Sequence, residues 1–131
     1  RANPWVNLFE NMLNFQAGFE ESPRATYFTN RSPRPGEETA YHGAFGRFGY
    51  CRLAFLPNLM GKGSVVLITG TDIASTDAGG EFLTSEAWMR VLSNALGVKD
   101  PDDFPYFEAL IRGQVVNNTV PQFAFVTARR H

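Results

Sequence analysis

Residues 64–80 constrain the fold of this chain most, because they join an apolar strand pattern to a helix pattern through a loop of small residues. The apolar run Val65 to Ile68 continues into Thr69 and ends at Gly70. A nearly continuous apolar run is typical of a strand that is covered on both faces. The pattern therefore predicts a central strand, with a ligand-binding turn where the strand passes into the following helix.

Helical spacing of apolar residues predicts further helices. The first covers residues 3–13, where an Asn-Pro start precedes a stripe of apolar side chains: Trp5, Leu8, Phe9, Met12 and Leu13. A short helix is expected over residues 77–83. A second begins at a cap on Thr84 or Ser85 and stops at Gly97. The spacing after Asp100 predicts another helix that Gly113 ends.

Alternating patterns predict strands over residues 15–20 and 25–31, which form a hairpin, and over 39–42, 50–56, 64–70 and 120–129. Residues 115–116 are also expected to be extended. Strands interleaved with helices indicate the α/β class, with α+β as the alternative. We expect a single mixed sheet of about five to six strands with helices on its faces, as in a Rossmann-like lobe. A right-handed crossover would join residues 64–70 to the last strand if the two are parallel.

Length and composition indicate one domain over residues 1–131. The chain is 44% hydrophobic and carries a formal net charge of −1. It therefore has material for a core, and its overall charge favours contact with neither nucleic acid nor a membrane. No signal peptide or membrane-spanning run is visible, so the localisation stays unknown. Because the chain begins at Arg1 and enters a helix at once, we expect a fragment or the C-terminal lobe of a longer protein.

The only cysteine, Cys51, excludes an internal disulfide and a multi-cysteine metal site. It lies in an apolar strand and is expected to be a buried small hydrophobic residue. The two histidines, His42 and His131, exclude a His-rich metal site. We therefore expect no metal and no cofactor.

The loop after the apolar run contains the candidate ligand-binding residues, which combine glycine, hydroxyl and carboxylate groups: Gly70, Thr71, Asp72, Ser75, Thr76 and Asp77. Free N–H groups at a helix start attract anions, but the two aspartates repel a bare phosphate. A neutral, sugar-like or metal-bridged ligand fits better. The alternative is that Ser75 or Thr76 only caps the helix. Neither the P-loop nor the dinucleotide-binding pattern is present.

No catalytic residue is predicted. A catalytic triad could be composed from Ser75, His42 and Asp72, but we do not predict one, because the chain has no GxSxG elbow. The adjacent carboxylates Glu37 and Glu38 point apart in an extended chain, so they do not form an acid–base pair. The glycine-spaced aromatic residues between 41 and 50 are interpreted as core and not as a nucleobase platform.

Five segments in a fixed order resemble the C-terminal α/β segment of an uncharacterised bacterial family: NPWVNLFENMLNF, NRSPRPGEETAYH, YCRLAFLPNLMGKGSVVLITGTD, STDAGGEFLTSEAW and PYFEALI. In that family the segment is often found behind DNA-binding or membrane-anchoring N-terminal regions. The resemblance spans nearly the whole chain and implies one α/β lobe of a ligand-binding or sensory module. It also implies that Asn3 begins a helix facing the ligand cleft.

The leading hypothesis is a non-enzymatic ligand-binding or sensory domain within a larger regulatory protein. Its partner would be an unidentified small molecule, with Arg47 or Arg52 supplying further polar contacts. This domain itself would contact neither nucleic acid nor a membrane, but it could pack against an upstream lobe or a second copy. One alternative is a hydrolase or transferase for a nucleoside- or sugar-like molecule, with Asp72 or Asp77 as the acid or base. The other is a structural interaction domain.

Overall fold

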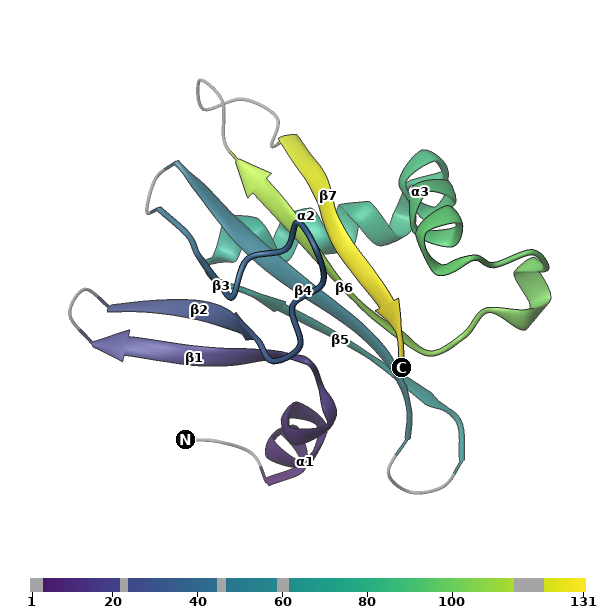
Figure 1. Cartoon of the computed structure of the whole chain (residues 1–131), viewed down its shortest axis with the longest axis horizontal. Coiled ribbons are helices and arrows are strands. Elements are labelled where there is room, and N and C mark those ends of the chain that lie inside the picture. Colours follow the sequence, from purple (N-terminus) through teal and green to yellow (C-terminus); the bar gives the residue numbers. More distant parts are fainter. Residues whose placement is uncertain (1–3, 22–23, 45–46, 59–61, 115–121) are drawn as a thin grey trace.

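Two antiparallel sheets and three α-helices make up the part of the chain that the computed structural model describes, which is residues 4–21, 24–44, 47–58, 62–114 and 122–131 (Figure 1). In chain order the elements are α1 (Pro4–Met12), β1 (Phe15–Glu21), β2 (Arg24–Asn30), β3 (Ala40–His42), β4 (Phe48–Pro57), β5 (Ser64–Gly70), α2 (Ile73–Thr84), α3 (Glu86–Leu96), a 3₁₀ turn (Pro101–Asp103), β6 (Phe107–Gln114) and β7 (Gln122–Arg130).

The strands form a three-stranded sheet of order β1-β2-β3 and a four-stranded sheet of order β5-β4-β6-β7. Every pairing between these strands is antiparallel. The predicted single mixed sheet of the α/β class is therefore wrong, because the fold is mostly β. The condition for the predicted right-handed crossover is not met, because three successive antiparallel pairings make β5 and β7 run in opposite directions.

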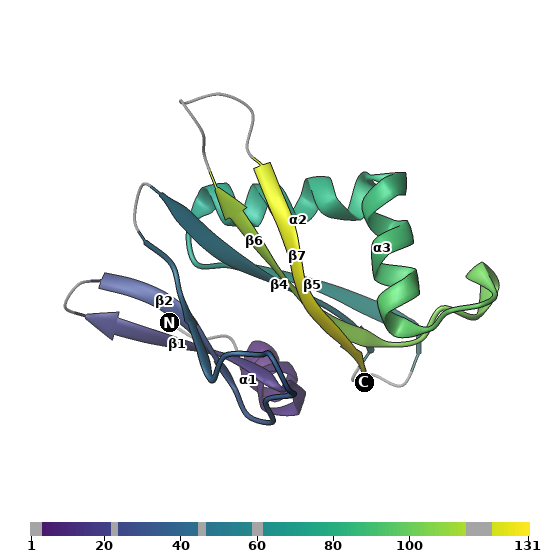
Figure 2. The same cartoon turned by 45° about the horizontal axis from the view of Figure 1, so that its top comes forward.

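The elements stack in three layers, with the four-stranded sheet in the middle (Figure 2). One face of this sheet carries α2 and α3, which bury the largest apolar cluster, around Leu53, Phe82, Leu92 and Ile111. The opposite face carries α1, through Phe9 and Leu13, and the three-stranded sheet. Alternation along each strand sends successive side chains to these two different neighbours.

β5 is an edge strand, which corrects the prediction that residues 64–70 are central. Among the described strands, only β4 pairs with it. Val65 and Leu67 pack toward α1, whereas Val66 and Ile68 point to the α2 side and stay 51% and 38% exposed. The continuous apolar run therefore reflects two partly covered faces and not a central position.

β6 corrects the prediction of a helix from Asp100 to Gly113. Only a 3₁₀ turn forms at Pro101–Asp103, and residues from Phe107 onward are extended. Pro105 lacks the N–H that a helix interior requires. Because β6 is buried on both faces, its apolar residues do not alternate with polar ones. Their spacing therefore resembles the apolar stripe of a helix.

The ends of α3 follow local sequence signals and confirm their prediction. The Ser85 side chain caps α3 by accepting the N–H of Trp88 at 3.3 Å. Gly97 ends α3 in the left-handed conformation, with φ of 70°. Arg130 of β7 donates from Nε to the carbonyl of Leu96 at 2.9 Å, so a cation lies at the negative end of the helix dipole.

The apolar stripe predicted for residues 3–13 is only partly buried. Phe9 and Leu13 are buried, but Leu8 and Met12 are 52% and 38% exposed. The side chain of Trp5 lies outside the described residues, as do Asn3 and residues 115–121 of the predicted extended segments.

Cys51 is a buried apolar residue, as predicted. It is fully enclosed between β4 and α2, where Gly79 leaves room for its Sγ atom. Burial raises the pKa of the Cys51 thiol to about 12. The thiolate, which is the reactive form, is therefore scarce at neutral pH.

We predict that Cys51 does not react with a disulfide reagent at about pH 8 while the protein is folded. Unfolding in guanidinium should expose it and give one labelled thiol per chain. Mass spectrometry of the intact protein measures both states. Complete labelling of the folded protein would contradict the enclosure.

Candidate functional site

The predicted site loop connects β5 to α2, and its aspartate serves the helix. Asp72 is the N-cap of α2, and its Oδ1 accepts the N–H of Ser75 at 2.7 Å. The Thr76 hydroxyl donates to the carbonyl of Asp72 at 3.0 Å. The helix begins at Ile73, so the predicted start at residue 77 lies too late. Capping was the alternative interpretation, but Asp72 performs it instead of Ser75 or Thr76.

The other polar groups of this loop pack against the start of β4. Thr71 donates its N–H to the Tyr50 carbonyl at 2.8 Å, and its Oγ1 accepts the Tyr50 N–H at 3.0 Å. Ser75 is buried, and a Cβ added to Gly49 would collide with the hydroxyls of Ser75 and Thr71. These residues therefore form a close strand-to-helix contact.

Of the remaining predicted site residues, Gly70 supplies space and Asp77 faces solvent. A Cβ on Gly70 would collide with the N–H and hydroxyl of Thr76. Asp77 is exposed. Asn3 lies outside the described residues, so its predicted position beside this loop stays a prediction.

We predict that Asp72→Ala lowers the free energy of unfolding by about 1 kcal/mol, the usual cost of losing an N-cap side chain. Asp77→Ala is the matched control, because its exposed side chain caps nothing, and its stability should stay close to that of the wild type. Urea unfolding followed by circular dichroism measures both. Equal stabilities of Asp72→Ala and the wild type would contradict the capping role.

A buried ion pair joins α1 and β1 to the four-stranded sheet. Arg52 of β4 is 1% exposed and bonds Glu10 of α1 through both terminal nitrogens, at 2.7 and 2.9 Å. It also donates to the carbonyl of Phe15 at 2.8 Å and to the hydroxyl of Thr69 at 3.1 Å. Arg52 is thus a buried structural residue, which corrects its prediction as a ligand contact. Arg47 is exposed.

A second buried carboxylate, Glu108 of β6, holds the junction between α1 and β1. Its two oxygens accept the N–H of Asn14 at 2.8 and 3.0 Å and the N–H of Phe15 at 2.9 Å. The side chain of Glu108 is 3% exposed and makes no ion pair with the described residues. Backbone donors therefore compensate for the burial of this group.

Glu37 lies in the loop between β2 and β3. It binds β7 on the face of the four-stranded sheet that carries α1 and the three-stranded sheet. It pairs with Arg129, and its Oε2 accepts the Thr127 hydroxyl at 2.6 Å. Burial favours the protonated form of Glu37. Hydrogen bonds from Thr127, the Arg34 N–H, Asn30 and Arg129 outweigh burial and lower its pKa from 4.5 to about 2.

We predict that Glu37 contributes acid-sensitive stability. Because its pKa is lower when folded, this contribution is present above about pH 4.5 and is lost as the pH falls toward about 2. A difference of this size corresponds to about 3 kcal/mol. Glu37→Gln should therefore lose less stability than the wild type between these two pH values.

Urea unfolding at a series of pH values measures this difference. Glu38→Gln is the control, because Glu38 is exposed and next in the chain. It should keep the pH dependence of the wild type. An unchanged pH dependence in Glu37→Gln would refute the contribution.

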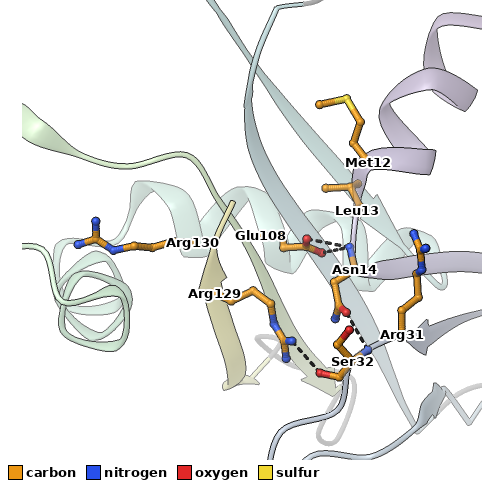
Figure 3. A pocket seen from close by; sticks show the side chains of 8 residues that line it. All are labelled: Met12, Leu13, Asn14, Arg31, Ser32, Glu108, Arg129 and Arg130. Atoms are coloured by element: carbon orange, nitrogen blue, oxygen red, sulfur yellow. Dashed lines mark hydrogen bonds between the residues drawn. The ribbon is translucent and has the colours of Figure 1, made fainter.

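A hollow of about 430 Å³ lies beside this polar network, where the layers meet (Figure 3). Four segments of the chain line it: the end of α1 with the two residues after it, the segment after β2, the strand β6 and the end of β7. The lining residues are Met12, Leu13, Asn14, Arg31, Ser32, Glu108, Arg129 and Arg130. Its size lies within the range of small-molecule sites.

The three arginines of the hollow differ in what they already bind. Arg129 is engaged with Glu37 and with the carbonyl of Ser32, at 3.0 Å for the latter. Arg130 points away toward the end of α3 (Figure 3). The exposed guanidinium of Arg31 has no hydrogen-bond or ion-pair partner among the described residues. Among the described residues that line the hollow, Arg31 is therefore the available cation.

Sequence reasoning missed this hollow. None of its lining residues was a predicted site residue, and Asn14 and Glu108 are 94 positions apart. No local motif marks the hollow, since the packing of the two sheets creates it.

The described residues hold no group of three or more His, Cys, Asp or Glu side chains placed to bind a metal ion. Within the same residues, no helix has the length and apolar character needed to cross a membrane.

Comparisons with protein-family models, curated proteins and solved structures find no match to this chain. The resemblance to an uncharacterised bacterial family therefore stays a prediction.

Proposed function

We propose that this protein is a non-enzymatic, small-molecule-binding domain of the sensory type, whose ligand occupies the hollow between the layers. The observation that carries the proposal is a 430 Å³ space with one available guanidinium, that of Arg31. The proposal moves the site from the loop after β5, where Thr71, Asp72 and Ser75 serve the packing of α2.

The lining favours an organic anion with an apolar part. Arg31 supplies a positive charge, and the Ser32 hydroxyl makes no hydrogen bond to the described residues. Met12, which is 38% exposed, supplies an apolar wall. Glu108 also lines the hollow, but three backbone N–H contacts neutralise much of its repulsion toward an anion.

The same contacts support binding over hydrolysis. A general base needs an oxygen that can reach a substrate proton. Both oxygens of Glu108 already accept backbone N–H groups, and Asp72 caps a helix. Of the two carboxylates suggested for a hydrolase or transferase, Asp72 and Asp77, the first is therefore engaged in a cap. The hollow offers no free carboxylate among its described lining residues to replace it.

The position of the hollow supports a sensory role. A bound anion would touch the segment after β2 through Arg31 and the end of α1 through Met12, which both lie over the four-stranded sheet. Binding would therefore hold these two segments together, and a ligand that binds only the folded state raises its stability.

We predict that small aliphatic carboxylates bind, and that Arg31→Gln weakens binding by about tenfold or more, as expected for the loss of a charge-assisted hydrogen bond. Isothermal titration calorimetry measures the affinities, with a neutral alcohol of the same length as the ligand control. Arg90→Gln is the matched protein control, because Arg90 is an exposed arginine on α3. Equal binding to Arg31→Gln and the wild type would place the ligand elsewhere.

A further inference from the structure

β5 is an unusually unprotected sheet edge. Its seven residues, Ser64–Gly70, include no charged residue and no proline. Two neighbouring side chains on one face, Val66 and Ile68, are 51% and 38% exposed. Proteins generally block such edges with lysine, proline or a bulge, because an open edge pairs with another strand.

The other edge of the same sheet has protection that β5 lacks. β7 ends in Arg129 and Arg130, and the carbonyl of Ala128 on β7 accepts a hydrogen bond from Arg34 at 3.4 Å. In the three-stranded sheet, the Ala17 N–H of the edge strand β1 donates to Glu10 at 2.6 Å, and the other edge strand, β3, is only 3 residues long. β5 is thus the sheet edge suited to pairing.

The hydrogen bonds at both ends of β5 define which backbone groups point outward. Thr71 bonds the Tyr50 carbonyl at one end, and Gly63 accepts the Asn58 N–H at the other. Hydrogen-bonded and non-bonded pairs alternate along an antiparallel ladder. The odd-numbered residues of β5 therefore bond β4. The even-numbered ones direct their N–H and C=O groups outward: Ser64, Val66, Ile68 and Gly70.

We propose that β5 pairs antiparallel with β5 of a second copy of this chain, about a two-fold axis at Leu67. In this register Val66 of one copy lies opposite Ile68 of the other, and Ser64 lies opposite Gly70. All four outward-facing residues then meet outward-facing residues, so the whole strand pairs. Val66 and Ile68 also form a cross-strand apolar pair, which stabilises a sheet.

Charge complementarity just beyond the two ends of β5 supports the same register. Counting outward from Leu67 brings the position of Lys62 of one copy opposite that of Asp72 of the other, once on each side of the axis, while Asp72 keeps its capping bond to Ser75. Lys62 is exposed and has no ion-pair or hydrogen-bond partner among the described residues. The result is one continuous sheet across two copies, with both α2 helices on the same face. This inference does not depend on the hollow or its ligand.

Sedimentation velocity over a range of protein concentrations tests the association. We expect a monomer–dimer equilibrium for the wild type, and a dissociation constant at least tenfold higher for Val66→Lys, because a lysine side chain guards the edge. Val91→Lys is the matched control, since Val91 on α3 is 38% exposed and lies off the edge. It should dimerise like the wild type. Circular dichroism checks that each variant is folded.

Cysteine cross-linking tests the register. Val66→Cys mixed with Ile68→Cys should form a disulfide-linked dimer under mild oxidation faster than either variant alone, because residues 66 and 68 face each other. Cys51 is fully buried and should not compete. Faster cross-linking of either variant with itself would overturn the register. A monomeric wild type would overturn the pairing, and so would a dimer that Val66→Lys leaves intact. Binding of another protein's strand to this edge would not rescue the proposal.

Discussion

The ion pair between Arg52 and Glu10 is the contact on which the arrangement of layers depends. Arg52 lies on the face of the four-stranded sheet that carries α1 and the three-stranded sheet, and it is 1% exposed. Its partners are Glu10 of α1, the Phe15 carbonyl of β1 and the Thr69 hydroxyl of β5. A buried charge that loses its partner costs about 3–5 kcal/mol. The α1–β1 segment is therefore required to cover this face.

Further buried polar contacts join the four-stranded sheet to the N-terminal layer, which consists of α1 and the three-stranded sheet. Glu108 binds the backbone of Asn14 and Phe15, and Glu37 binds Arg129. The two faces of the central sheet thus differ in kind. The α2–α3 face is held by an apolar cluster, whereas the opposite face combines smaller apolar clusters with directional polar contacts. Polar contacts fix the orientation of the N-terminal layer more strictly than apolar packing does.

Sequence reasoning succeeded where the signal was local. Ser85 and Gly97 mark the two ends of α3, as predicted. The strand predicted from the alternation around Phe15 and Phe19 matches β1. It found β5 as a strand but failed for its position in the sheet, and it failed for β6 altogether. Both runs of apolar residues arise from burial by different neighbours on two faces. A run of this kind does not distinguish a central strand from an edge strand, or a buried strand from a helix.

The candidate site shows the same limit. The pattern of a strand, small polar residues and a helix predicted that a helix follows β5, but α2 begins at Ile73 and not at residue 77. The same pattern serves a cap as well as a ligand. Asp72 and Ser75 form the cap here. The hollow beside Arg31 depends on segments brought together by the packing of two sheets. Its residues share no spacing that a linear pattern can detect.

The bonds from Glu108 to Asn14 and Phe15 also determine an order of assembly. They join positions 94 and 93 residues apart, and Arg129 joins Glu37 across 92 residues. During synthesis the N-terminal segments leave the ribosome long before β6 and β7 exist. A β1–β2 hairpin alone is at most marginally stable in water. The segments from α1 to β2 therefore complete these contacts only once β6 and β7 have been made.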